Sequence, residues 1–343
     1  MLENLEPRRL FAATLSDDGL LRVNGTTDND EIRIERRHIG DISTPHRYFV
    51  FINGVQVRTF SVESVQRARI NALEGNDVVS SDVTCYVEGS AGNDTLQGGD
   101  SEDTLNGGNG NDLLTGRGGS DFLAGGAGRD RIRGDEGTGP GDRDGNDTLD
   151  GGPGDDILSG DGGADRFLGG SGIDTADYAD RSDNVLVAIG PILLFPDWPV
   201  GHFGGVLPEP GAYLAKPYPQ FDPSQYAGTG WREGDAIDLD VEHARGGRGN
   251  DVLWGSGSDN LLQGGGGNDN LYGGLGTDSL YGDAGNDRLF AADRTDAFPT
   301  IGTQRILERV HGGGGSDYAM VDWSDPPLCA MIDRLEVLPA LTS

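Results

Sequence analysis

Aspartates recur at nine-residue intervals along much of this chain, and their surroundings indicate a repeated cation site. In each unit, glycines precede the aspartate and a large aliphatic residue follows it by two positions, as in Gly107-Gly108, Asp112 and Leu114. Glycine permits the positive φ angles of a tight turn, which lets backbone carbonyls point inward beside the carboxylate. Calcium takes six to eight oxygen ligands, whereas zinc and copper favour His or Cys clusters that this sequence lacks. The metal ligands predicted in this way are Asp94, Asp103, Asp112, Asp121, Asp130, Asp147, Asp156, Asp165, Asp174, Asp251, Asp269, Asp278, Asp287 and Asp317.

The unit G-G-x-G-x-D-x-U-x, where U is a large aliphatic residue, resembles the calcium-binding nonapeptide of the RTX (hemolysin-type) repeat proteins. The resemblance covers roughly 90–176 and 246–290, plus 312–319. It implies an all-β parallel β-roll or β-helix solenoid, in which two nonapeptides form one coil and several calcium ions lie between turns 18 residues apart. Asn260 replaces one register aspartate, so we expect a weaker site there. The turns that should share sites are those of Asp94 and Asp112, Asp103 and Asp121, Asp112 and Asp130, Asp251 and Asp269, Asp269 and Asp287, and Asn260 and Asp278.

One turn of the first tract is longer than the rest. Asp147 follows Asp130 by 17 residues rather than nine, and no large aliphatic residue lies between Ile132 and Leu149. We therefore infer one turn enlarged by eight residues, which leaves open whether the turn of Asp121 stacks on that of Asp147. The acids of the enlarged turn favour a solvated bulge over a peripheral cation site; they are Asp135, Glu136, Asp142 and Asp144.

The start of the chain resembles an export leader. Residues 5–11 read Leu-Glu-Pro-Arg-Arg-Leu-Phe, similar to the LEPR-x-L-L leader of certain exported bacterial surface proteins, with Phe11 in place of the last leucine. An amphipathic N-terminal turn is the alternative interpretation. An ordinary secretory signal is not indicated, because the basic start and the continuous apolar run are missing. If the resemblance holds, the protein is extracellular or at the cell surface.

The remaining segments flank or interrupt the repeats. Asn53-Gly54 predicts a hairpin between strands at 48–52 and 55–60, and a further strand is expected at 185–189. Prolines and aromatic residues crowd 191–231, where they either pack on the solenoid flank or form a ligand surface. The predicted segments are a leader-like segment at 1–14, a β-rich N-terminal cap at 15–88, a first RTX tract at 89–176, an irregular insert at 177–245, a second RTX tract at 246–290, and a final degenerate repeat with a C-terminal cap at 291–343.

Charge is distributed unevenly along the 343 residues, which carry a formal net charge of −31. Residues 1–70 hold ten basic and ten acidic side chains, so the rest of the chain holds 16 of the 26 basic and 47 of the 57 acidic ones. Such a chain needs cations to become compact, and it offers no basic face for nucleic acid.

No run approaches the roughly 18 apolar residues of a membrane span. Cys85 and Cys329 make no disulfide framework, and we expect both to be small buried residues.

Catalytic motifs are missing from the sequence. None of the five histidines forms His-Glu-x-x-His, and Gly169 to Ile173 fails the Gly-x-Ser-x-Gly pattern at its last position. The leading hypothesis is therefore an exported structural or adhesive surface protein with calcium-coupled folding, which has calcium and cell-surface polysaccharide or matrix as candidate partners. An enzyme acting on acidic polysaccharide, a lyase, epimerase or hydrolase, is the alternative. A third hypothesis is an ice- or glycan-binding module that uses the insert.

Overall fold

The structure is a computed structural model, and it is almost entirely β. It divides into two compact units, Met1–Gly172 and Ile173–Ser343. The residues that the structure describes are 12–38, 46–135, 145–182, 184–190, 235–274, 276–291, 309–322, 328–330 and 334–338. Residues 1–11 of the predicted leader-like segment, three acids of the enlarged turn (Glu136, Asp142 and Asp144) and the aromatic run at 191–231 lie outside these ranges. Residues 12–14 of the predicted leader-like segment belong instead to the first strand of the fold, which pairs with the second.

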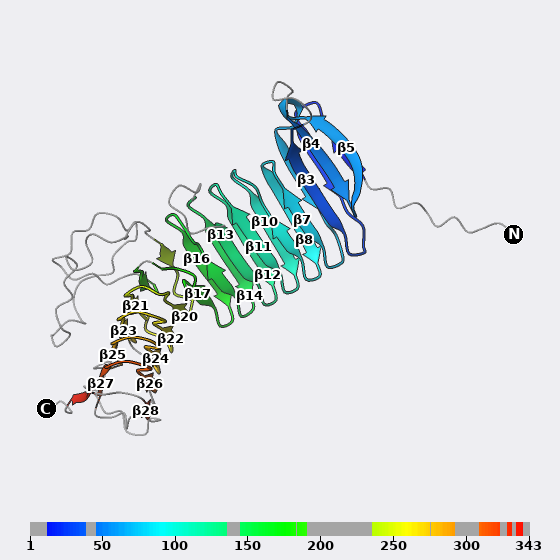
Figure 1. The fold of residues 1–343 in the computed structure, drawn as a ribbon. Helices are drawn as coiled ribbons and strands as arrows, with labels where there is room; N and C mark the ends of the chain where they lie inside the picture. The colour runs from blue at the N-terminus through cyan, green and yellow to red at the C-terminus, as the bar shows by residue number, and fades with distance from the viewer. Residues whose placement is uncertain are drawn as a thin grey trace, which may run out of the picture. The chain divides into compact units, whose positions relative to one another are not determined.

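The first unit is a parallel solenoid with two facing sheets (Figure 1). From β6 to β16 consecutive strands alternate between the sheets, so that two nine-residue units complete one coil. The first sheet runs in the order β1 (Ala12–Leu15), β2 (Leu20–Asn24), β6 (Arg67–Asn71), β8 (Cys85–Ala91), β10 (Thr104–Asn109), β12 (Phe122–Ala127), β14 (Thr148–Pro153) and β16 (Arg166–Ser171). The second runs in the order β15 (Ile157–Ser159), β13 (Arg131–Asp135), β11 (Leu113–Arg117), β9 (Thr95–Gln97), β7 (Val78–Ser81), β3 (Glu31–Arg37), β4 (Arg47–Ile52) and β5 (Val55–Ser61).

Strand register confirms the predicted 18-residue coil. Leu105 pairs with Leu123 across β10 and β12, and Leu114 pairs with Ile132 across β11 and β13. The enlarged turn adds eight residues without breaking the stack, because Leu123 pairs with Leu149, 26 residues later. One turn has grown and no coil has been skipped.

Solenoid coils already begin within residues 15–88, the segment predicted as a cap. β2, β6 and β8 are parallel neighbours, as are β3, β7 and β9. Antiparallel pairing joins β1 to β2 and β4 to both β3 and β5, and the 3-10 turn η1 (Val62–Ser64) follows β5. The predicted hairpin between β4 and β5 is confirmed, and positive φ angles of 51° at Asn53 and 74° at Gly54 form its turn. The N-terminal segment is thus part of the solenoid, with a hairpin added at its end.

The second unit repeats the two-sheet plan. The predicted strand at 185–189 is found as β18, and Ile189 continues it in a bridge to Ile237 of β19 (Ala236–Ile237). One sheet of this unit contains β17 (Thr175–Asp177), β20 (His243–Arg245), β22 (Leu261–Gln263), β24 (Ser279–Tyr281), β26 (Arg309–His311) and β28 (Leu328–Ala330). The other contains β18 (Leu186–Ala188), β21 (Val252–Trp254), β23 (Asn270–Tyr272), β25 (Arg288–Phe290), β27 (Tyr318–Asp322) and β29 (Arg334–Leu338).

From β9 to β16 the core is a narrow seam with one large buried apolar side chain per strand. Leu96, Leu105, Leu114, Leu123 and Ile132 are at most 1% exposed, and their neighbours in each strand point outward.

Cys85 is a free buried cysteine, as predicted for that residue. No helix in the described residues is long and apolar enough to cross a membrane.

Leu113 and Leu114 give a direct test of this seam. Leu114→Ala should lower the free energy of unfolding by about 2–5 kcal/mol, because a fully buried leucine leaves a cavity. Leu113 is 42% exposed, so Leu113→Ala should change it by about 0.5 kcal/mol or less. Denaturant unfolding at saturating calcium measures both. Equal losses at the two positions would contradict the assigned faces.

Candidate metal centre

The predicted metal ligands line up in rows inside the turns. All fourteen aspartates are buried, with exposed fractions of 0–3%. Within a row the Oδ1 atom of each carboxylate accepts a hydrogen bond from the backbone N–H of the register residue one coil earlier. These hydrogen bonds join Asp94 to Asp112 (2.7 Å), Asp103 to Asp121 (2.7 Å), Asp112 to Asp130 (2.7 Å), Asp130 to Asp156 (2.7 Å), Asp147 to Asp165 (2.8 Å), Asp251 to Asp269 (2.8 Å), Asp269 to Asp287 (2.9 Å), Asn260 to Asp278 (2.9 Å) and Asp287 to Asp317 (3.0 Å).

The row also crosses the enlarged turn. The N–H of Asp121 donates to Asp147 Oδ1 at 2.8 Å, which answers the question that the sequence left open. Asp135, the one acid of that turn within the described residues, is 2% exposed and accepts a hydrogen bond of 3.2 Å from the N–H of Gly145. Asp135 is therefore buried, and the expectation of a solvated bulge is wrong for this residue.

The second carboxylate oxygen distinguishes these aspartates from ordinary turn residues. In seven of them the Oδ2 atom is buried and accepts no hydrogen bond from the part of the chain that the structure describes: Asp94, Asp112, Asp121, Asp130, Asp147, Asp269 and Asp287. Two others each have a backbone donor, Gly99 for Asp103 Oδ2 at 2.6 Å and Gly247 for Asp251 Oδ2 at 2.7 Å. Buried polar atoms are normally hydrogen-bonded, and an unpaired buried charge is costly. A row of such oxygens is therefore suited to a cation.

Glycine opens the space beside each of these oxygens. A Cβ on Gly98 would lie 2.5 Å from Asp103 Oδ2 and 2.7 Å from the carbonyl oxygen of Gly116 in the next coil. The same construction recurs at Gly246, where both oxygens would lie 2.5 Å away. Among the described residues no group of three or more His, Cys, Asp or Glu side chains could hold a metal. Backbone carbonyl oxygens such as those of Gly116 and Gly264 lie in the same turns as the carboxylates, and a set of oxygen ligands of this kind would fit calcium.

Electrostatics in the absence of cations favour protonated carboxyls. Burial raises the pKa of Asp121 to about 8, with further contributions from the neighbouring charges of Asp147, Asp103 and Asp135. Burial likewise raises the pKa of Asp269 to about 8, and Asp251 and Asp287 add to the effect. A bound cation would relieve both the burial of charge and the mutual repulsion.

Comparison with protein families identifies these turns. The family model described as RTX calcium-binding nonapeptide repeat (4 copies) matches residues 86–114, 115–138, 143–176, 240–271 and 255–289. The chain carries RTX calcium-binding nonapeptide repeats. Such repeats bind several calcium ions per tract, so calcium is the cation of this protein. No curated protein matches the chain.

Two acidic positions before the matched RTX residues extend one row. Asp77 is 1% exposed and its N–H donates to Asp94 Oδ1 at 2.7 Å, while Asp77 Oδ1 accepts from the N–H of Asp30 at 2.6 Å. The carboxylate of Asp30 is satisfied by Thr26 N–H at 2.5 Å and by Asn53 Nδ2 at 2.7 Å. Hydrogen bonds from Thr26 and Asn53 thus satisfy the carboxylate of Asp30, where the row ends. Residues 28–32 and 75–79 are degenerate forms of the nonapeptide, and they were the sequence signal available for Asp30 and Asp77. The hairpin between them hides the regular spacing.

Other register positions hold different side chains. Cys85 stands one coil before Asp103, and its N–H donates to Asp103 Oδ1 at 2.6 Å. Glu242 accepts from the N–H of Asp174 through Oε2 at 2.9 Å, although 68 residues separate them. Asn260 donates from Nδ2 to the carbonyl of Glu242 at 2.8 Å. An amide carries no charge, and the weaker site at Asn260 stays a prediction.

Proposed function

We propose that this chain is an exported structural or adhesive protein of the extracellular space or cell surface, and that calcium completes its folding. The observation that carries the proposal is the buried row of Oδ2 atoms that lack hydrogen-bond donors. We assign the fourteen register aspartates as calcium ligands, together with backbone carbonyls of the glycine turns.

Coupling between calcium and folding follows from the energetics of these turns. The acidic part of the chain repels itself, and its many glycines lose much conformational entropy on folding. Calcium offsets both costs, so that the binding free energy becomes folding free energy. Extracellular calcium sites commonly work at about 10⁻⁴–10⁻³ M, which suits a protein that folds after export. The resemblance of residues 5–11 to an export leader supports the same location.

A structural or adhesive role is supported by how the coils are built. Strands such as β11 and β12 contribute one large apolar side chain to a thin core and direct its neighbours outward, which leaves outer sheet faces open to solvent. Such faces are suited to contact with surfaces and polymers. Localising the tagged protein in cell, surface and medium fractions tests export, and recovery in the cytosolic fraction alone would contradict it.

Removal of calcium should unfold most of the protein. We expect far-UV circular dichroism to lose its β signal in chelator and to regain it on titration to about millimolar calcium. Magnesium is the control, because its smaller ion demands near-ideal octahedral geometry and should restore little signal at the same concentration. A spectrum that is unchanged between chelator and calcium would sink the proposal.

A further inference from the structure

The outer face of the first sheet in the first unit carries a straight column of unusual side chains. Strand register aligns Arg22 on β2, Arg69 on β6, Tyr86 on β8, Thr104 on β10 and Phe122 on β12. Each lies beside a buried core residue and points away from the core. Neighbouring strands lie about 4.8 Å apart, so the column spans about 19 Å across five strands.

Two unpaired positive charges stand side by side in this column. Arg22 and Arg69 are exposed direct neighbours, and neither makes an ion pair or hydrogen bond within the described part of the chain. Like charges opposite one another on adjacent strands destabilise a sheet. Their isolation is the more notable because the whole chain carries a net charge of −31. This pair is a site where an anion would be bound favourably.

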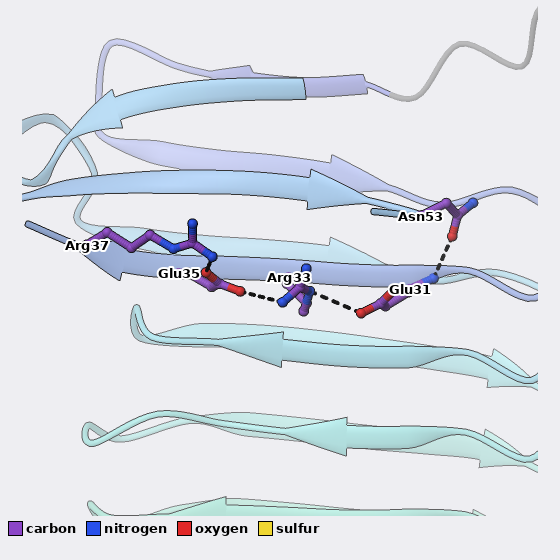
Figure 2. A network of polar contacts seen from close by, with 5 residues as sticks. All are labelled: Glu31, Arg33, Glu35, Arg37 and Asn53. Carbon is purple, nitrogen blue, oxygen red and sulfur yellow. Dashed lines mark hydrogen bonds and ion pairs between the residues drawn. The ribbon is translucent and has the colours of Figure 1, made fainter. Parts of the chain in front are cut away.

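β3, on the other sheet, shows how the chain neutralises arginines elsewhere. Its outward side chains alternate in sign, and Figure 2 shows them joined in one network. Arg33 Nε lies 3.1 Å from Glu31 Oε1, and Arg33 Nη1 lies 2.6 Å from Glu35 Oε1. Arg37 also pairs with Glu35. Carboxylate partners could have been placed beside Arg22 and Arg69 in the same way, yet none is present within the described residues.

Aromatic side chains continue the column beyond the arginines. The guanidinium carbon of Arg69 lies 5.0 Å from the centre of the Tyr86 ring, and the Tyr86 hydroxyl donates to Glu88 Oε2 at 2.8 Å. Phe122 is 43% exposed, so its ring is open to a ligand on this face of the sheet. Together with Tyr86 it places two aromatic side chains in the column. The column therefore offers cationic groups at one end and ring surfaces along the rest.

We infer that this column, from Arg22 to Phe122, is a docking track for a linear polysaccharide that carries carboxylates. Guanidinium groups bind carboxylates through paired hydrogen bonds, and sugar rings pack their apolar faces on aromatic side chains. One side chain per strand along a straight line suits an extended polymer better than a compact ligand. Calcium bound to the aspartate rows would reduce the repulsion between the acidic solenoid and a polyanion. The inference rests on the proposed surface role and names its partner.

Calorimetric titration of calcium-saturated protein with oligogalacturonate tests the track, and the fully methyl-esterified oligomer serves as the uncharged ligand. The ester should bind about tenfold or more weakly than the acid, and Arg22→Gln/Arg69→Gln should weaken binding of the acid by a similar factor. Phe122→Ala should weaken binding of both oligomers. The matched control is Arg33→Gln/Arg37→Gln, which removes the same charge from the other sheet and should leave affinity within about twofold.

The track would be overturned if the wild type did not bind the acidic oligomer, or if the two double variants lost equal affinity for it. It would also be overturned if the wild type bound no oligogalacturonate but self-associated, and Arg22→Gln/Arg69→Gln abolished that self-association. The calcium titration by circular dichroism, run on the same samples, separates this inference from the proposed function. A normal calcium transition without oligomer binding removes the track alone. Arg22→Gln/Arg69→Gln relieves repulsion but loses the contact between Arg69 and the Tyr86 ring, so its thermal midpoint should stay close to that of the wild type. With an unchanged calcium transition, weaker binding is then assigned to the lost charges and not to misfolding.

Discussion

Gly110→Ala should be among the most damaging single substitutions in the first unit, with a loss of about 4 kcal/mol or more in the free energy of unfolding at saturating calcium. Gly110 has a φ of +143°, which side-chain-bearing residues rarely adopt. A Cβ at this position would overlap the carbonyl oxygen of Gly92, which lies directly beneath it in the preceding coil. On the other side the N–H of Gly110 donates to the carbonyl of Ala127 at 2.7 Å, so the backbone cannot move away without losing that bond.

Gly54→Ala provides the matched control for this substitution. Gly54 also has a positive φ, +74°, but a Cβ there would meet no atom within 4 Å. Its replacement should therefore cost only the conformational strain of about 1–2 kcal/mol. Chemical denaturation of both variants in calcium measures the difference. Similar losses for Gly54→Ala and Gly110→Ala would mean that positive φ, rather than contact between coils, determines the requirement for glycine.

The register of the repeats could be predicted from the sequence because it depends only on the number of residues between successive inward aliphatic side chains. The spacing of Leu105, Leu114 and Leu123 fixes which side chains face the core, and a parallel coil of two units then fixes which strands pair. Counting also identified the eight extra residues after Ile132, since an enlarged turn changes the interval without changing the order of inward residues. Local periodicity thus carried both the fold and the positions of the register aspartates.

Positions that depend on long insertions were not predictable in this way. The hairpin of β4 and β5 lies between Asp30 and Asp77, which are 47 positions apart instead of the 18 of a regular coil, so the row that they continue is not marked by a constant interval. Glu242 joins the row of Asp174 across 68 residues for a similar reason. The alignment of Arg22 with Arg69 requires the register of two strands on either side of the same hairpin. Three-dimensional pairing is needed to bring these residues together.

Asp269→Asn should change the stability of the protein in opposite directions with and without calcium. Asparagine has nearly the same shape and keeps an oxygen for the N–H of Asp251, which donates to Asp269 Oδ1 at 2.8 Å. It removes the negative charge, however, and that charge is what a cation site uses. With calcium bound, we expect the variant to be less stable and its calcium affinity to fall by about tenfold or more, since ligand charge tunes such sites.

Without calcium the same substitution should stabilise the protein. Burial, together with the charges of Asp251 and Asp287, raises the folded-state pKa of Asp269 to about 8, whereas the unfolded value is about 3.9. Between about pH 4 and pH 8 the folded state binds the proton more tightly than the unfolded state, so stability falls as the pH rises through this range. Asparagine does not titrate, so its contribution to the free energy of unfolding should stay constant over this pH range.

Chelator-treated wild-type protein should therefore keep more β signal in far-UV circular dichroism at pH 5 than at pH 8, and Asp269→Asn should keep that signal to a higher pH. Asp259→Asn is the control, because Asp259 is exposed and its Oδ1 atom accepts the N–H of Thr277 at 2.7 Å, a bond that asparagine can retain. The stability of Asp259→Asn should match that of the wild type both with calcium and in chelator. If Asp269→Asn is destabilising in chelator at pH 8, the carboxylate row is stable without a cation, and the coupling between calcium and folding must come from elsewhere in the turns.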